Sequence, residues 1–204
     1  MKERILIKAQ EIFTKDGYSR LNMDNLARNL GISKKTLYEH FDSKQSLFHE
    51  VLKSIYQKRS DKSKEISDKM IKDNKFDFTS HVSEMSKWIA EFSKIFTSQL
   101  ESDIEKYAHD IIPMCQEQEG EVMKNWEKVF LLGKEKGYIK ENINRNVFWL
   151  MLSTSIHRIM RPNVLINLPY SGEDVMKMIY EVLTIGVLTE KGREEYIEKN
   201  INNK

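Results

Sequence analysis

Residues 22–44 form the stretch NMDNLARNLGISKKTLYEHFDSK, which decides the fold of the N-terminal part of the chain. Asn22 can cap a helix over Met23 to Leu30, because its side-chain oxygen can accept a hydrogen bond from an unpaired amide of the first turn. Gly31 then lets the chain turn, since glycine tolerates backbone conformations that other residues avoid. The stretch therefore begins with one short helix that ends in a sharp turn.

Two further helix starts follow in the same stretch. Ser33 caps a predicted helix from Lys34 to about His40, and Asp42 or Ser43 caps another that begins at Lys44. Crossing helices need a small apolar core, which is supplied by Leu26, Ala27, Leu30, Ile32, Leu37 and Phe41. A preceding helix has its apolar face at Ile5, Leu6, Ala9, Ile12 and Phe13. These features predict a three-helix unit that contains a helix-turn-helix.

Polar residues of the second short helix avoid its two apolar positions, Leu37 and Phe41. They are Lys34, Lys35, Thr36, Tyr38 and His40. A helix lying in the major groove of DNA would direct such donors toward bases and phosphates, while the apolar pair faces the core. The pattern favours DNA binding, although a small packed subdomain with a solvated lysine pair has similar patterning.

Two segments, ILIKAQEIF and GYSRLNMDNLARNLGISKKTLYEHFDSKQSLF, resemble the N-terminal domain of the TetR/AcrR family of bacterial transcriptional repressors. The resemblance spans residues 4 to about 52. Its most specific part is TLYEHFDSK at residues 36–44, where the family pattern has a Tyr, an aromatic before a short turn, and a Lys opening the next helix. The resemblance implies a DNA-binding head on a helical body.

The resemblance also implies individual DNA contacts. Phosphate contacts would come from Tyr38, His40 and Lys44. Groove contacts would come from Lys34, Lys35 and Thr36, and Asn22 completes the expected DNA-binding set. Two positions depart from the family pattern: Lys35 stands where a glycine is common, and Asp24 stands where some members carry a basic, base-reading residue. Phosphate would repel this acid unless it accepts from a cytosine amino group or pairs with a neighbouring Arg.

Charge is distributed unevenly along the chain. Its 204 residues include 33 basic and 31 acidic side chains, and the resulting net charge of +2 by itself implies no nucleic-acid partner. Residues 1–56 hold ten Lys and Arg against seven Asp and Glu. This weakly positive segment suits a protein that contacts a few phosphates without coating DNA.

The composition predicts an all-α, soluble, cytoplasmic protein. Few glycines and prolines interrupt the chain, and alternating β-branched runs bounded by turns are lacking. The longest apolar run, Val147 to Leu152, is far shorter than the roughly twenty residues of a membrane span. The N-terminus lacks an apolar signal segment, and the single cysteine, Cys115, agrees with a reducing compartment.

Two domains are expected. Residues 1–56 form the helix-turn-helix DNA-binding domain, and residues 57–204 form a larger helical domain for effector binding and dimerisation. A highly polar stretch from Gln57 to Lys75 joins them. Pro113 is expected to separate two of the later helices. The predicted helices of the larger domain are Phe78 to Ser98, Glu101 to Ile112, Met114 to Lys136, Asn144 to Met160 and Glu173 to Leu188.

The last two predicted helices carry apolar residues on more than one face. The stretch VFWLML at residues 147–152 is apolar all round, whereas a helix with one buried stripe would alternate with polar residues. The second cover is either the core of the same chain or another subunit. The family resemblance implies the latter, a homodimer through the two C-terminal long helices. Twofold pairing would place two recognition helices at successive major grooves and so predicts a palindromic operator on double-stranded DNA.

Bulky, partly adaptable apolar side chains in the larger domain predict a cavity for an apolar or aromatic small-molecule effector. They are Met85, Trp88, Phe92, Phe96, Met123, Trp126, Phe130 and Met151. The same residues at helical spacing would also serve as ordinary core, and the family resemblance is what favours a ligand site.

No sequence pattern supports catalysis, a metal site or a cofactor, because nucleophile triads, phosphate-binding glycine loops and paired carboxylates are lacking. Three hypotheses remain. The first is a dimeric repressor released from its operator by a small molecule. The second is a DNA-binding regulator controlled by a protein partner and lacking a small-molecule pocket. The third is a helical enzyme or ligand carrier with a vestigial head.

Overall fold

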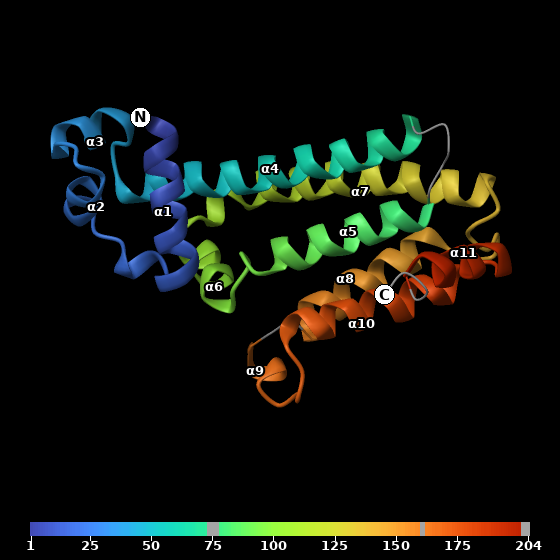
Figure 1. Ribbon diagram of the computed structural model, residues 1–204. Helices are drawn as coiled ribbons and strands as arrows, with labels where there is room; N and C mark the ends of the chain where they lie inside the picture. Colours follow the sequence, from blue (N-terminus) through green and yellow to red (C-terminus); the bar gives the residue numbers. More distant parts are fainter. Residues whose placement is uncertain (73–77, 160–161, 201–204) are drawn as a thin grey trace. The chain divides into compact units, whose positions relative to one another are not determined.

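The computed structural model describes residues 1–72, 78–159 and 162–200 (Figure 1). This part of the chain consists of helices, turns and one isolated bridge, so the all-α prediction is confirmed. The chain divides into two compact units. The first unit contains Met1–Ser60 and Ile95–Gly120, and the second contains Asp61–Lys94 and Glu121–Lys204. The long helices α4 (Lys44–Lys72) and α7 (Ile112–Glu135) contribute residues to both units.

The first unit begins with α1 (Lys2–Asp16), the 3-10 turn η1 (Tyr18–Arg20), α2 (Met23–Leu30) and α3 (Lys34–His40), followed by α4. Local chemistry sets these boundaries. Asn22 Oδ1 accepts from the backbone amides two and three residues further on, at 2.9 and 3.1 Å. Gly31, with a φ of 66°, ends α2, and Ser33 Oγ accepts from the Thr36 amide at 2.9 Å. The predicted bounds of α2 and α3 are confirmed.

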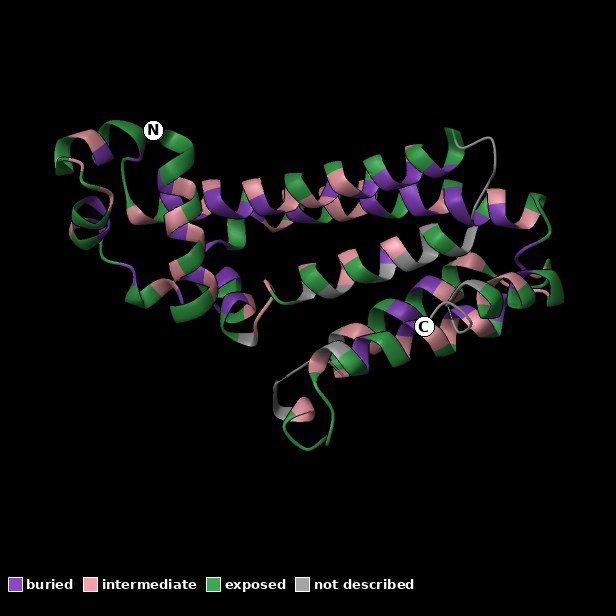
Figure 2. Ribbon diagram, viewed as in Figure 1, coloured by how far each residue is buried: buried purple, intermediate pink, exposed green. Residues whose placement is uncertain are grey.

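The core of the first unit is built largely as predicted (Figure 2). The buried members of the predicted core are Ile5, Ala9, Phe13, Leu26, Ala27, Leu37 and Phe41. Those that remain partly exposed are Leu6, Ile12, Leu30 and Ile32. Phe13 packs against Phe48 of α4 with ring centroids 4.7 Å apart. The helix α6 (Ser98–Tyr107) joins this core through buried Leu100 and Ile104.

The helix predicted from Glu101 to Ile112 is present only as far as Tyr107, and the break predicted at Pro113 is wrong. The helix α6 ends at Tyr107, the 3-10 turn η2 (His109–Ile111) follows, and α7 already begins at Ile112. Pro113 thus lies in the first turn of α7, where an amide has no partner inside the helix and the proline ring costs no hydrogen bond. The proline therefore belongs to the start of a helix and does not separate two.

The second unit contains parts of α4 and α7 together with α5 (Phe78–Ser93), α8 (Arg145–Ile159), α9 (Pro162–Leu165), α10 (Gly172–Val187) and α11 (Glu190–Asn200). The helix α10 packs against α5 and α8, and α11 packs against α5. The helices α8 and α10 match the predicted ones to within a residue at each described end, whereas Met160 lies outside the described residues. The helix α5 ends five residues before the predicted Ser98, and α9 and α11 were not predicted.

A short antiparallel contact closes one end of the second unit. Ile139 bridges Leu188, and the Thr189 amide donates to Tyr138 O at 2.9 Å. Gly192 allows this approach, because a Cβ atom at that position would lie 2.7 Å from Tyr138 O. None of the helices in residues 1–72, 78–159 and 162–200 has the length and apolarity needed to cross a membrane.

Candidate nucleic-acid interface and ligand pocket

The helix α3 separates an apolar from a polar side, as the sequence predicted. Leu37 is completely buried in the first unit, whereas Lys34, Lys35 and His40 are exposed. Tyr38 is 44% exposed, although aromatic rings are usually covered when a core is available. Its hydroxyl and the basic side chains around it form an exposed donor surface on a short helix, the kind of surface that contacts phosphates and base edges.

Asn22 and Thr36 of the predicted DNA-binding set form hydrogen bonds at the starts of helices. The side-chain oxygen of Asn22 caps α2, as described above. Thr36 Oγ1 lies 2.8 Å from Ser33 Oγ at the start of α3. The Asn22 oxygen therefore helps to fix the start of α2, and the Thr36 hydroxyl helps to fix the start of α3. That either side chain also contacts DNA stays a prediction.

Asp24, the acidic residue that departs from the family pattern, has a partner on α3. Asp24 Oδ2 forms an ion pair with Lys34 Nζ, and both side chains are substantially exposed. The acid thus pairs with a lysine of the next helix, where the sequence had suggested a neighbouring Arg. The pair holds one cation at the start of α3, and it offsets part of the positive charge there.

Lys44 is positioned by an aromatic ring. Its Nζ lies 4.4 Å from the centroid of the Tyr18 ring and donates to Ser19 O at 3.4 Å. Partial burial lowers the pKa of Lys44, while Tyr107 and Asp103 act in the opposite direction. The lysine is therefore fixed at the start of α4, next to the segment that leads from α1 to α2.

Asp103 is a buried acid that is hydrogen-bonded to the backbone of Tyr18, the residue whose ring contacts Lys44. Asp103 of α6 is 3% exposed, and its carboxylate accepts from the Tyr18 amide at 2.6 Å and from Gln99 Nε2 at 3.0 Å. The rings of Tyr18 and Tyr107 stack with centroids 4.1 Å apart. Within the first unit, α6 is thus bound to the same turn that orients Lys44.

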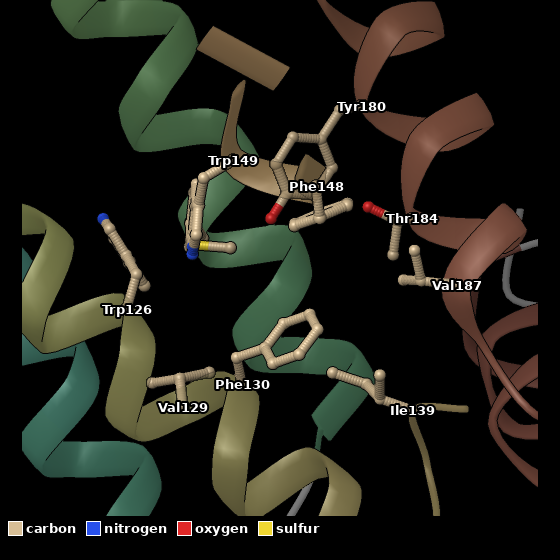
Figure 3. A pocket seen from close by; sticks show the side chains of 10 residues that line it. Trp126, Val129, Phe130, Ile139, Phe148, Trp149, Tyr180, Thr184 and Val187 are labelled. Carbon is tan, nitrogen blue, oxygen red and sulfur yellow. The ribbon is translucent and has the colours of Figure 1, made fainter. Parts of the chain in front are cut away.

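A mostly apolar pocket lies inside the second unit (Figure 3). Its space measures about 380 Å³, including its opening to solvent. It is lined by Met85, Trp126, Val129, Phe130, Ile139, Phe148, Trp149, Tyr180, Thr184 and Val187. Tyr180 is hydrogen-bonded to Thr184, and burial raises the pKa of the Tyr180 hydroxyl, so this phenol stays protonated. None of these ten described lining residues carries a charge.

The structure brings only part of the predicted pocket set together. Met85, Trp126 and Phe130 line the pocket. Trp88 contacts Trp126 and Phe92 through its ring, with centroids 5.8 and 6.0 Å away. The others lie elsewhere: Phe96 packs against Tyr56 in the first unit, and Met123 and Met151 are exposed.

Sequence reasoning did not select the pocket residues of α8 and α10. Phe148 and Trp149 belong to the VFWLML run, whose all-round apolarity predicted a second cover, either the core of the same chain or another subunit. The run in fact serves two surfaces, since Trp149 faces the pocket while Leu150 is 66% exposed. The sequence signal was that apolar residues lie on every side of the helix. This signal indicates that two different surfaces cover the helix, but it does not show which residue faces which surface.

Large apolar side chains are exposed on α8 and α10. They are Val147, Leu150 and Met151 on α8, and Met178 and Val182 on α10. Val182 is 70% exposed, and the space over Gly186, one turn further along α10, is open. We call these five side chains the exposed apolar strip.

Comparisons with known proteins agree with the helix-turn-helix geometry. Residues 5–51 match the family model described as bacterial regulatory proteins, tetR family. The biofilm operon negative transcriptional regulator IcaR of Staphylococcus aureus strain Newman is 36% identical over 56 residues, which is 28% of this chain and only 30% of IcaR. The uncharacterized HTH-type transcriptional regulator YvaF of Bacillus subtilis strain 168 is 24% identical over 193 residues, which is 94% of this chain and 97% of YvaF.

A solved structure extends the fold comparison over most of the chain. The TetR family regulator PfmR of Thermus thermophilus superposes with a TM-score of 0.62 at 20% identity, covering 89% of this chain and 97% of PfmR. The similarity in fold thus includes the helical body as well as the head. IcaR, YvaF and PfmR are each described as transcriptional regulators. Residues 5–51 thus match the tetR family of bacterial regulatory proteins, while the likeness to PfmR shows the fold of the longer stretch alone.

Proposed function

We propose that this protein is a dimeric repressor that binds a palindromic operator through α3 and is released from it by a small apolar or aromatic ligand. The observation that carries the proposal is the α3 surface, on which Leu37 is buried while Lys34, Lys35, Tyr38 and His40 are exposed. Residues 1–56 serve as the DNA-binding domain in this proposal, and residues 57–204 serve as the effector-binding and dimerisation domain.

The proposed contacts divide into two kinds. Tyr38, His40 and Lys44 bind phosphates, which position the protein without reading sequence. Lys35, an exposed side chain with a long donor, reaches into the groove and reads bases. Lys34 is available to the groove only together with its partner Asp24, so its contribution to affinity is smaller than that of an unpaired lysine.

The exposed apolar strip supports the dimer. Soluble monomers rarely leave neighbouring large apolar side chains in water, and such patches commonly mark an interface. A twofold axis next to α8 and α10 would cover the strip with its own copy, because a symmetric interface uses the same surface on both subunits. Two recognition helices could then reach major grooves about 34 to 36 Å apart.

The pocket supports regulation by a small molecule. An effector shifts a conformational equilibrium only by its differential affinity for two states, so the ligand must bind the operator-bound form less well than the released form. In the proposed mechanism the helix α4 carries the change, because it provides residues to the second unit and also begins with Lys44.

The test begins with selection of bound fragments from genomic DNA, followed by affinity measurements on the selected operator. Tyr38→Phe and Lys44→Ala are expected to weaken binding to all DNA about equally. Lys35→Ala is expected to change the preference among sequences by about 1 to 3 kcal/mol, if the side chain reads a base. Affinity measured over a range of salt should fall with a log slope near −0.9 per neutralised phosphate.

Lys64→Ala is the matched control, because it removes the same charge from an exposed position on the second-unit part of α4. It should leave the affinity and the salt slope within experimental error of the wild type. Unchanged operator affinity in all three head variants would refute the assigned contacts. Failure to recover any fragment with salt-dependent affinity would refute the regulator itself.

A further inference from the structure

The pocket wall contains an unusual polar atom. Trp149 is only 9% exposed, and its indole nitrogen is buried with no hydrogen-bond partner among the described residues. Figure 3 shows this nitrogen at the end of the ring that lies toward the other lining side chains. Buried indole groups usually find an acceptor, because leaving a donor unpaired away from water costs free energy.

The two hydroxyl groups of the wall are already paired with each other. Tyr180 and Thr184 are hydrogen-bonded to one another and can remain so. The indole N–H is a donor only, so what it lacks is an acceptor. A molecule that brings an acceptor to Trp149 thus gains a hydrogen bond without breaking one within the pocket.

The remaining wall favours flat aromatic surface. The ring centroids of Trp149 lie 6.4 Å from Trp126 and 5.5 Å from Phe148, and those of Phe130 and Phe148 lie 5.8 Å apart. Met85 completes the wall with a flexible thioether side chain that can adapt to the shape of a guest. With no charge on the described lining residues, a buried anion or cation would lose its hydration without a counter-ion.

We propose that the effector of this pocket is a neutral, largely aromatic molecule that carries a hydrogen-bond acceptor, and that Trp149 Nε1 donates to this acceptor. The inference rests on the proposed function for its regulatory meaning, but the binding chemistry is independent of DNA. Trp149 is then the residue that selects between ligands of equal shape.

The experiment uses three naphthalene probes of similar size and the full chain. 2-Acetylnaphthalene is neutral and has a carbonyl acceptor, 2-isopropenylnaphthalene has a similar size and shape without an acceptor, and 2-naphthoate is an anion. Calorimetric titration of the wild type should give the ketone an affinity roughly tenfold higher than the hydrocarbon, the effect of satisfying one buried donor. The naphthoate should bind more weakly than the ketone.

Two variants assign the preference to one residue. Trp149→Phe keeps an aromatic ring but removes the donor, and it should reduce the preference for the ketone to less than about twofold. Trp126→Phe is the control, since Trp126 lines the same pocket and its nitrogen points away from the other lining residues in Figure 3. It should keep the preference. The comparison of probes on the wild type needs no variant and holds even if a variant folds poorly.

The probe affinities of the wild type and of Trp149→Phe together decide the inference. Equal affinities for ketone and hydrocarbon, binding of none of the three probes, tighter binding of the naphthoate, or a preference that survives Trp149→Phe would each overturn the inference. Operator affinity of the same preparations is measured in parallel. Absence of operator binding by the wild type would overturn the regulator proposal alone, since the probe affinities are measured without DNA.

Discussion

At the scale of single residues, Asp103 is expected to contribute to the stability of the first unit. Its carboxylate is buried, and it accepts from the Tyr18 amide and from Gln99. Asp103→Ala would leave that part-buried amide without its acceptor. We expect the free energy of unfolding to fall by about 1.5 to 3 kcal/mol, the usual range for a hydrogen bond to a charged group. Urea denaturation of the wild type and the variant measures this difference.

Glu105→Ala is the control for this measurement, because Glu105 lies exposed on the same helix. It should change stability by less than about 0.5 kcal/mol. Equal effects of the two substitutions would show that the hydrogen bonds of Asp103 contribute nothing particular. The sequence could not have singled out Asp103, because its backbone partner Tyr18 is 85 residues away along the chain.

At the scale of elements, the contact between α2 and α3 sets the charge of the proposed DNA-binding surface. Asp24→Asn removes the partner of Lys34 and one negative charge from the surface. We expect tighter binding to unrelated DNA, a log salt slope that is steeper by about 0.9 because Lys34 can neutralise one more phosphate, and a smaller ratio of operator to unrelated affinity. Fluorescence anisotropy titrations at several salt concentrations measure all three quantities.

Asp68→Asn, a like substitution in the second-unit part of α4, controls for net charge alone. It should leave the salt slope unchanged. If Asp24→Asn lowered the affinity for operator and for unrelated DNA alike, the acid would be contacting DNA in its own right, and its proposed role in restraining Lys34 would be wrong.

The ends of a helix could be predicted from the sequence where residues adjacent in the chain determine them. The bounds of α2 and α3 follow from the caps at Asn22 and Ser33 and from the turn at Gly31, all within three residues of a helix end. The break was placed at Pro113 because proline is excluded from helix interiors. Proline is nevertheless tolerated in the first turn of a helix, so the residue alone does not distinguish a helix start from a helix end. The helix α11 was not predicted because its sequence is strongly polar and lacks an apolar stripe.

At the scale of the whole molecule, the packing of helices determines which apolar residues line the pocket, and the sequence pattern alone does not. Of the eight predicted pocket residues, the structure places Met85, Trp126 and Phe130 in one wall and Phe96 in the other unit. Helical spacing shows that a side chain is apolar and on which face of its own helix it lies. It does not show which other helix covers that face, so Trp149 and the exposed Leu150 could not be told apart.

The exposed apolar strip leads to the last prediction. Leu150→Lys combined with Val182→Lys places two charges on side chains that are 66% and 70% exposed in the single chain, so the fold of the subunit should be preserved. A symmetric dimer would bury four lysines, two from each subunit, at a cost that no new partner offsets. Sedimentation should show a dimer of about twice 24.2 kDa for the wild type and the 24.2 kDa subunit for the variant. Operator affinity should fall by roughly a hundredfold or more, because each half-site is then bound separately.

Ile197→Lys is the matched control, since Ile197 of α11 is also an exposed apolar residue but lies outside the strip. It should leave the dimer and its operator affinity intact. A wild type that sediments as a single subunit would refute the dimer. A double variant that remains dimeric would instead place the interface on another surface, because two lysines on α8 and α10 cannot be buried against their own copies without dissociating them. The two failures are therefore separable: the first concerns whether subunits pair, and the second concerns which helices they use.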